Sequence, residues 1–343
     1  MVLSYQELKM KNISAAQTKT NGAWAMVICA IGWSLAGVFM KYVNINSFAM
    51  AGFRSVFAFI TIAALTRHFP RFVIKNESGD IDKKLTLYLW LAASNYAATM
   101  ILFCLCNKLT YSANAVLLQY TNPAWIILLG PFLLGEKNTR IDYLSIMGVV
   151  IGMLLFFADT IFGSLLGSSS STNTVTTSVV NPNTITLGNI LALVSGITFG
   201  LTTIFQRKLQ LLSQATTNNE SEKSNTNTAG DAFMIAQIIT AAFGLIFVFT
   251  TDNGIPDSKS LLFLVLLGVV QMGIPNVAYT IGIKKVRALS ASLITMLEPL
   301  MNPIWVFLFV HEVPSVFSII GGVIILGCIL MREVLNKRLT TQI

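Results

Sequence analysis

Long apolar blocks alternate with short polar segments along the whole chain, and each block is about 20 residues long, the length of a helix that spans the hydrocarbon core of a bilayer. Breaking the blocks at charged residues, at Gly, Pro and Asn clusters and at Ser/Thr runs predicts ten spans. They cover residues 22–40, 48–66, 85–106, 112–134, 141–160, 186–206, 231–250, 260–283, 288–310 and 315–332. The pattern therefore predicts an all-α integral membrane protein with ten transmembrane helices.

The polar segments divide the chain into two halves. The predicted division is a tail over residues 1–21, a first five-helix repeat over 22–160, a linker over 161–185, a second five-helix repeat over 186–333 and a tail over 334–343. The linker is rich in Ser, Thr and Asn and carries no charge, so it cannot bury a core and is expected to be flexible. We expect the same of a polar loop over 207–230 inside the second repeat.

Composition agrees with this picture, because the 343 residues are 54% hydrophobic and only 11% charged, whereas an ordinary soluble domain is about 25% charged. The net charge of +8 arises in the loops and does not indicate a nucleic-acid partner. With a cytoplasmic N-terminus, 19 Lys and Arg fall in cytoplasmic segments and 3 in outer loops, as the positive-inside rule requires. We expect a multi-pass protein of the plasma (inner) membrane with both termini cytoplasmic.

Two short motifs recur at a fixed distance. Thr121-Asn122-Pro123, then twelve residues, then Glu136 corresponds to Leu297-Glu298-Pro299, then twelve residues, then Glu312, at an offset of 176. Gly22, Ile31 and Leu35 of the first span likewise match residues of the sixth span at an offset of 166. Because each half holds an odd number of spans, the second half enters the membrane from the opposite side, an inverted repeat typical of secondary transporters.

With these motifs the chain resembles the drug/metabolite transporter superfamily, in its EamA-like branch. The resemblance rests on the five-plus-five inverted repeat, the Pro-x12-Glu signature of each half and the Glu298-Pro299 pair, and it covers about residues 22–333 without the polar linkers. It implies a central cavity lined chiefly by spans one, three, four, six, eight and nine, with alternating access by rocking of helix groups. Export is the direction that the resemblance implies.

One carboxylate lies deep in a predicted span. An ionisable group inside lipid costs roughly 2.5 to 3.5 kcal/mol, and Glu298 lies about ten residues, hence about 15 Å, into the ninth span. At spacings of three and four, one helix face carries Thr295, Glu298, Asn302 and Trp305. We expect this face to line the cavity, with Glu298 contacting a substrate ammonium or taking a proton. The alternative is a structural carboxyl that satisfies backbone groups freed by the neighbouring prolines.

Arg54 is the one basic residue inside a span. It lies about seven residues from the outer end of the second span, too deep for easy snorkelling to the interface, so it needs a partner within the protein. The sequence leaves three open: Glu298, a backbone carbonyl at a kink and a substrate carboxylate. A structural or gating role is expected.

Other spans carry amides, hydroxyls and aromatic rings at comparable depth. Candidates for the cavity wall are Gln119, Asn122 and Trp125 in span four, Asn95 and Thr99 in span three, Gln271, Asn276 and Tyr279 in span eight, and Trp33 in span one. Asn122 matches Glu298, Asn95 matches Gln271 at the offset of 176, and Trp33 matches Phe199. The alternative is that buried amides join helices to one another, at about 0.6 kcal/mol each.

Prolines within spans remove a backbone donor and free the carbonyl four residues back. Pro123, Pro275 and Pro299 would free the carbonyls of Gln119, Gln271 and Thr295 near the cavity, either as acceptors for a cation or water or simply as kinks that help packing. Glu136 and Glu312 end spans four and nine at opposite membrane faces, and we expect them to serve as gates or loop anchors.

The motifs that are missing narrow the function. The sequence has no G-x-x-x-x-G-K-[ST] and no H-E-x-x-H, so we expect neither ATP as a drive nor a cofactor or metal. No span carries a Lys, which disfavours organic phosphates. We predict a secondary transporter, not an enzyme, for a small metabolite such as an amino acid or a related zwitterion or cation, coupled to protons through Glu298 or uncoupled. Alternatives are uptake of a quaternary amine such as choline in an aromatic cage, and a receptor or enzyme.

Overall fold

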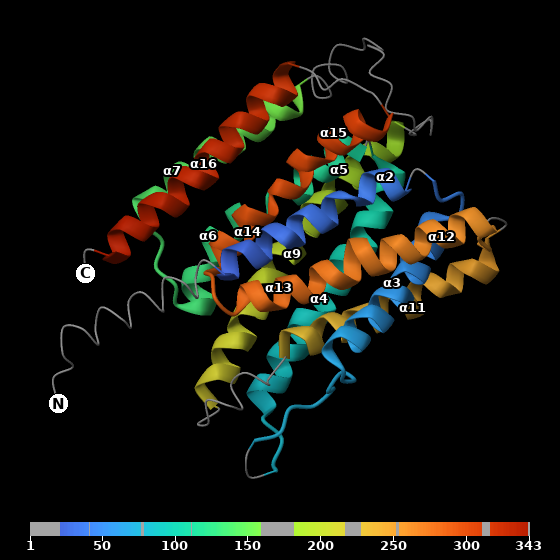
Figure 1. The fold of residues 1–343 in the computed structure, drawn as a ribbon, viewed down its shortest axis with the longest axis horizontal. Helices are drawn as coiled ribbons and strands as arrows, with labels where there is room; N and C mark the ends of the chain where they lie inside the picture. The colour runs from blue at the N-terminus through green and yellow to red at the C-terminus, as the bar shows by residue number, and fades with distance from the viewer. Residues whose placement is uncertain are drawn as a thin grey trace.

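The computed structural model describes residues 21–40, 42–76, 79–110, 112–158, 182–216, 228–251, 254–310 and 316–341, most of which are helical (Figure 1). The helices are residues 21–34, α2 (Ala36–Met40), α3 (Ser47–Thr66), α4 (Lys83–Leu109), α5 (Ser112–Gln119), α6 (Asn122–Leu134), α7 (Arg140–Phe156), α9 (Pro182–Thr216), α11 (Thr228–Thr250), α12 (Ser258–Leu266), η1 (Leu267–Gly273), α13 (Ile274–Ile283), α14 (Ala288–Thr295), α15 (Leu297–Val310) and α16 (Val316–Thr341). Within these residues the β pairing consists of a bridge between Lys75 and Ile81.

Seven helical runs in the described part of the chain are long and apolar enough to cross a membrane. They are Asn21–Met40, Ser47–Thr66, Lys83–Cys106, Ala115–Leu134, Thr184–Ala215, Thr228–Thr250 and Ser258–Ile283. The helices α7, α14, α15 and α16 lie over the other three predicted ranges. At 17 residues α7 extends about 26 Å, somewhat less than the bilayer core of about 30 Å, so the count of ten spans stays a prediction.

Two described spans are interrupted where the sequence places prolines, and a third changes from α-helix to π-helix before a proline. Pro123 and Pro275 occupy the first turn of α6 and α13, and Pro299 is the third residue of α15. In the first turn of α6 and α15 the missing N–H has no helical acceptor to lose, so the expected kinks there are helix breaks, whereas before Pro275 the helix stays continuous and passes through the π-helix η1. The carbonyls of Gln119 and Thr295 lie at the ends of α5 and α14, where carbonyls lack intrahelical donors in any case.

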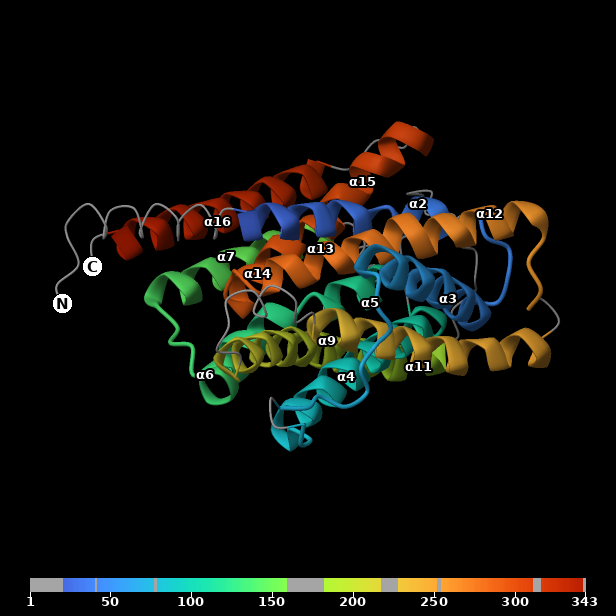
Figure 2. The same cartoon turned by 60° about the horizontal axis from the view of Figure 1, so that its bottom comes forward.

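Several helix pairs cross closely, and two of them, α3 with α11 and α7 with α16, each join one helix of each half. A Cβ added to Gly244 of α11 would lie 2.5 Å from the backbone nitrogen of Gly52 of α3. A Cβ added to Gly321 of α16 would lie 2.5 Å from the carbonyl oxygen of Gly152 of α7, and these two helices lie side by side along one edge of the bundle (Figure 1, Figure 2). Glycine is needed at both crossings because the backbones approach too closely for a side chain.

Helix α9 is longer than the sequence predicts, running from Pro182 to Thr216, and so extends into both the expected linker and the expected loop over 207–230. Its polar residues beyond the span have partners. Gln210 Nε2 donates to Thr228 Oγ1 at 2.9 Å, and Arg207 Nη1 donates to the carbonyls of Ile283 and Lys284 at 2.9 and 2.8 Å. A hydropathy rule ends the helix at these residues because it does not include such contacts.

The connections between helices gather into two groups. Segments predicted to be cytoplasmic contact one another: Arg71 pairs with Asp231, and Glu136 pairs with Arg207 and Arg287. Segments predicted to be outside also contact the outer ends of predicted spans, since the backbone N–H of Asn44 donates to Ser260 Oγ at 3.1 Å and Thr110 Oγ1 lies 2.6 Å from Asn189 Oδ1. The helices therefore run between two polar ends, with the buried side chains of the core between them.

Candidate functional site

The break between α14 and α15 places Glu298 in the first turn of α15, where the partial positive charge of a helix N-terminus favours a carboxylate. Tyr120, directly after the end of α5, lies close enough to Glu298 for its hydroxyl and the Glu298 carboxyl group to interact. Tyr120 is buried and Glu298 is partly buried. Two interrupted helices, one from each half, thus meet at this carboxyl group.

A second part of the site centres on Asn276 of α13. Its Oδ1 accepts hydrogen bonds from Trp33 Nε1 at 3.2 Å and from the Tyr96 hydroxyl at 3.4 Å. Gln271 of η1 donates from Nε2 to the Trp33 carbonyl at 3.4 Å, and all four side chains are buried. The structure therefore brings predicted residues of spans one and eight together and adds Tyr96 of α4, which the sequence analysis missed although it follows Asn95.

Aromatic rings pack around this amide. Trp33 stacks on Tyr279 with ring centroids 5.7 Å apart and an interplanar angle of 26°, and its centroid lies 6.2 Å from that of Phe199. Phe233 of α11 meets Tyr279 and Tyr96 edge-on at 5.3 and 4.7 Å. Tyr279 also donates from its hydroxyl to Thr203 Oγ1 at 3.2 Å. Since one face of Trp33 is covered by Tyr279, the rings pack as a cluster and not as an open cage.

Arg54 of α3 points into the protein, and only 3% of its surface is exposed. Its Nη2 lies 3.6 Å from the Met100 thioether of α4, and its Nε has no hydrogen-bond partner among the described residues. The guanidinium interacts electrostatically with Glu298 and Tyr96. In the described part of the chain, however, no carboxylate forms an ion pair with Arg54, so a direct salt bridge to Glu298 is not formed.

The predicted polar face of span nine is divided by the helix break. Thr295 ends α14 and donates its hydroxyl to the Ser292 carbonyl at 2.8 Å, whereas Glu298 and Trp305 lie on α15. Trp305 donates from Nε1 to Ser34 Oγ on the first helix at 2.7 Å. The side chain of Asn302 lies outside the described residues. Helical spacing alone treats the span as continuous, and that is why it places Thr295 and Glu298 on one face.

Span four contributes a fully buried amide. Asn122 begins α6, and neither its Oδ1 nor its Nδ2 has a partner among the described residues. Gln119 is also buried, and Trp125 donates from Nε1 to Thr121 Oγ1 of its own turn at 3.2 Å. Asn122 is therefore the residue of this set whose polar atoms stay available to a further group.

The polar residues predicted in span three mainly join helices. Thr99 Oγ1 lies 2.8 Å from Thr198 Oγ1 of α9, and Ser195 of α9 lies within hydrogen-bond distance of the Thr99 carbonyl. Asn95 donates from Nδ2 to the Leu91 carbonyl one turn back at 2.8 Å. The Thr99 contacts match the alternative role for buried polar groups, in which they hold helices together, whereas the Asn95 hydrogen bond stays within α4.

An ionic cluster at one end of the bundle is formed by Glu136, Asp142, Arg207, Arg287 and Arg332. Glu136 lies 3.4 Å from Arg207 and 3.6 Å from Arg287. Asp142 lies 2.8 Å from Arg332, both fully buried, and 3.4 Å from Arg287. The cluster connects α7, α9, α16 and the segments that follow α6 and α13. Glu312, the predicted counterpart of Glu136, lies outside the described residues.

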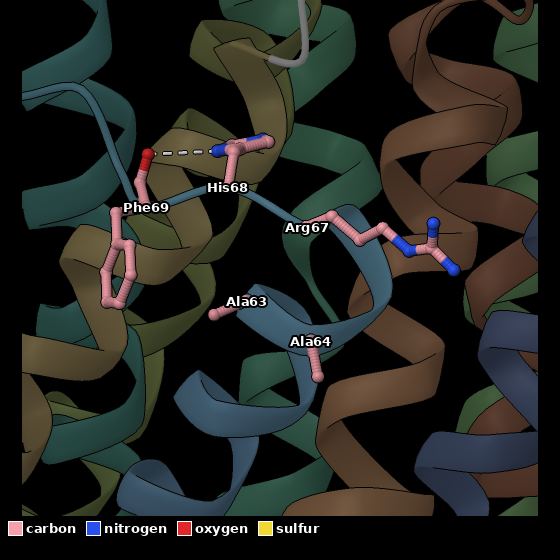
Figure 3. Close-up of a pocket in the computed structure, with 5 residues that line it drawn as sticks. All are labelled: Ala63, Ala64, Arg67, His68 and Phe69. Atoms are coloured by element: carbon pink, nitrogen blue, oxygen red, sulfur yellow. Dashed lines mark hydrogen bonds between the residues drawn. The ribbon is translucent and has the colours of Figure 1, made fainter.

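A surface pocket of about 400 Å³ lies at the end of α3, away from these residues. It is lined by Ala63, Ala64, Arg67, His68 and Phe69, of which Arg67 extends away from the others (Figure 3). His68 Nδ1 lies 2.9 Å from the Phe69 carbonyl, and the Phe69 ring is 78% exposed. The lining offers mostly apolar contacts and contains none of the predicted site residues.

Comparison with known proteins agrees with the resemblance stated above. A sequence model of the EamA-like transporter family matches the chain twice, over residues 20–158 and 186–332. A protein of Archaeoglobus fulgidus named an uncharacterized transporter is 23% identical over 311 residues, which cover 90% of this chain and 95% of that protein. One crystal structure superposes with a TM-score of 0.69 at 15% identity, covering 93% of this chain and 99% of the other, a likeness of fold.

Proposed function

The chain belongs to the EamA-like transporter family of the drug/metabolite transporter superfamily, and from that premise we propose that it moves a small amine-bearing metabolite, an amino acid or a related zwitterion or cation, across a membrane. It is a multi-pass membrane protein. The transport acts by alternating access to a central cavity between the two halves. Glu298 binds the ammonium group of the substrate.

The observation that carries this proposal is the position of Glu298. A carboxyl group among membrane helices is costly and marks a substrate or ion pathway, and interrupted helices form the binding sites of many secondary transporters. Glu298 begins the second half of one interrupted helix and faces Tyr120 at the interruption of another. Asn122 and Asn276 are buried with polar atoms that lack partners among the described residues, which suits a site that also accepts a ligand.

The membrane arrangement that we propose is ten helices in a five-plus-five inverted repeat. Two matches of one family model, over similar lengths, support two repeats. The close crossings of α3 with α11 and of α7 with α16 support a two-fold relation between the halves, because such a relation brings equivalent helices together. The odd number of spans in each half is the reason that we propose an inversion.

We also propose a gate at the cytoplasmic end and a direction of transport. The ionic cluster holds the cytoplasmic end closed, and its ion pairs separate when the cavity opens to that side. The excess of Lys and Arg in the segments at this end supports its cytoplasmic location. We place the protein in the plasma membrane with both termini inside and as an exporter, with a proton on Glu298 as the coupling ion or no coupling ion.

The test is a thermal-shift screen of the detergent-purified protein against amino acids, amines including choline, nucleosides and sugar phosphates. A ligand at 100 times its Kd stabilises the folded state by about 2.7 kcal/mol. We expect an amine-bearing compound to raise the Tm of the wild type but not of Glu298→Gln. Asp257→Asn is the matched control, because Asp257 is an exposed cap of α12 and Asn also caps a helix.

Three outcomes contradict the proposal. Stabilisation by sugar phosphates alone overturns the substrate class. Full stabilisation of a folded Glu298→Gln variant shows that the carboxyl group is structural. Stabilisation by choline together with no response to any amino acid favours uptake of a quaternary amine, which would require the aromatic residues Trp33, Trp125, Tyr279 and Trp305 to form a cage around the ligand.

A further inference from the structure

We propose that Arg54 binds a carboxylate of the transported molecule, so that the substrate is a zwitterion held between Arg54 and Glu298, with an α-amino acid as the simplest member of the class. This inference rests on the proposed function of Glu298 and narrows it. It assigns the substrate carboxylate as the ligand of the buried guanidinium. Amines without a carboxylate and acids without an ammonium group are then not the preferred substrates.

Arg54 has hydrogen-bonding capacity that the described residues do not satisfy. A guanidinium carries five N–H donors, and burying it is unfavourable unless a partner compensates. In the described part of the chain, the Met100 thioether 3.6 Å from Nη2 is a weak acceptor, and Nε has no partner. Because only 3% of the side chain surface is exposed, Arg54 does not reach the membrane interface. Within the described residues, then, its charge is not compensated by an ion pair.

Arg54 and Glu298 carry opposite charges but do not form an ion pair among the described contacts. The two charges nevertheless interact. Tyr96 lies in the field of both, and Tyr120 faces Glu298. Arg54 contacts Met100 of α4, and Tyr96 one turn away on the same helix donates to Asn276. The guanidinium therefore lies next to the buried polar cluster, while Glu298 lies in the first turn of α15 without an ion pair to Arg54 in the described part of the chain.

The charge of a ligand decides whether it compensates Arg54, Glu298 or both. A cation would pair with Glu298 and leave Arg54 uncompensated, whereas an anion would pair with Arg54 and leave Glu298 uncompensated. A zwitterion compensates both and adds no net charge to the membrane interior, where unpaired charge is costly. A planar guanidinium also matches the two oxygens of a carboxylate better than an ammonium does.

The experiment compares probes that differ only in these two groups. L-Leucine, L-phenylalanine and L-threonine are titrated into purified protein in lipid nanodiscs, each beside the amine that lacks its carboxylate and the acid that lacks its ammonium. For the wild type we expect at least one amino acid to bind tenfold or more tightly than both of its analogues. This comparison needs no variant, so it is independent of any folding defect.

Variants of Arg54 and Glu298 test which side chain binds the carboxylate of the amino acid and which binds its ammonium group. Arg54→Gln should lose at least tenfold in affinity for the amino acid while binding of the amine analogue is unchanged, and Arg54→Lys should recover part of the loss. Glu298→Gln should lose affinity for both the amino acid and the amine analogue, while binding of the acid analogue is unchanged. Arg67→Gln, one residue beyond α3 at the surface pocket, is the control that removes an Arg elsewhere.

The outcomes separate the two claims. If the wild type binds an amine as tightly as its amino acid, or a folded Arg54→Gln retains full affinity for the amino acid, Arg54 does not bind the carboxylate, and the proposed function of Glu298 still stands. If the probes and the wider amine panel all fail to bind and Glu298→Gln changes nothing, the proposed function fails and this inference fails with it.

Discussion

The candidate site consists of buried polar and aromatic side chains, most of which the sequence analysis identified. Trp33, Gln271, Asn276 and Tyr279 were predictable, because polar and aromatic groups stand out in an apolar span, and the structure brings them together. Tyr96 was not predictable, because the rotation of α4 about its axis depends on its neighbours and not on its own spacing. How far these residues serve a substrate stays a prediction, whereas their mutual hydrogen bonds are a property of the fold.

At the residue scale the strongest expected stability effect is at Asp142. Its carboxylate pairs with fully buried Arg332 and also with Arg287, and removing one partner of a buried ion pair costs about 3 to 5 kcal/mol. Asp142→Asn should therefore lower the Tm of the purified protein by several degrees, measured by fluorescence-detected size exclusion after heating. The exposed Asp257→Asn should leave it close to wild type, and an unchanged Tm for Asp142→Asn would show that the cluster adds little stability.

The observed helices show which helix bounds hydropathy predicts correctly and which it does not. Hydropathy located the long apolar helices to within a few residues, because burial in lipid depends on composition. It did not show that the spans with Pro123 and Pro299 are interrupted, because a proline is compatible with a kink as well as with a new helix start. It also ended α9 too early, because Arg207 and Gln210 have tertiary partners that no local rule includes.

At the element scale, two glycines of α16 provide a matched test of the α7–α16 crossing. A Cβ at Gly321 meets the backbone of Phe156 and Gly152, whereas a Cβ at Gly327 meets nothing within 4 Å. Gly321→Ala should destabilise by about 1 to 3 kcal/mol through overpacking. Gly327→Ala should be neutral or slightly stabilising, because Ala is the better helix former. Equal thermal stabilities of the two variants would contradict the close crossing.

The whole molecule combines two similar halves with two polar ends. The repeat was predictable from motifs at offsets of 166 and 176, since an internal duplication leaves traces in the sequence. The ionic contacts at one end were not, because the five residues of the ionic cluster come from segments far apart in the chain. Glu136 was a candidate only through its place in the repeat.

At this scale the orientation can be measured directly. Lys75 and Lys259 are both exposed and lie on segments that we assign to opposite sides of the membrane. In intact cells, Lys259→Cys should react with a membrane-impermeant maleimide, and Lys75→Cys should react only after permeabilisation. The wild type serves as the background for the four native cysteines. The reverse labelling pattern would invert the proposed topology.

The central claim, transport through a site that contains Glu298, is tested most directly by counterflow in proteoliposomes loaded with the amino acid that stabilises the protein most. The account predicts that wild type accumulates the labelled external amino acid transiently, that Asp257→Asn does the same, and that Glu298→Gln stays at the level of protein-free liposomes. Wild-type rates for a correctly folded Glu298→Gln would contradict it.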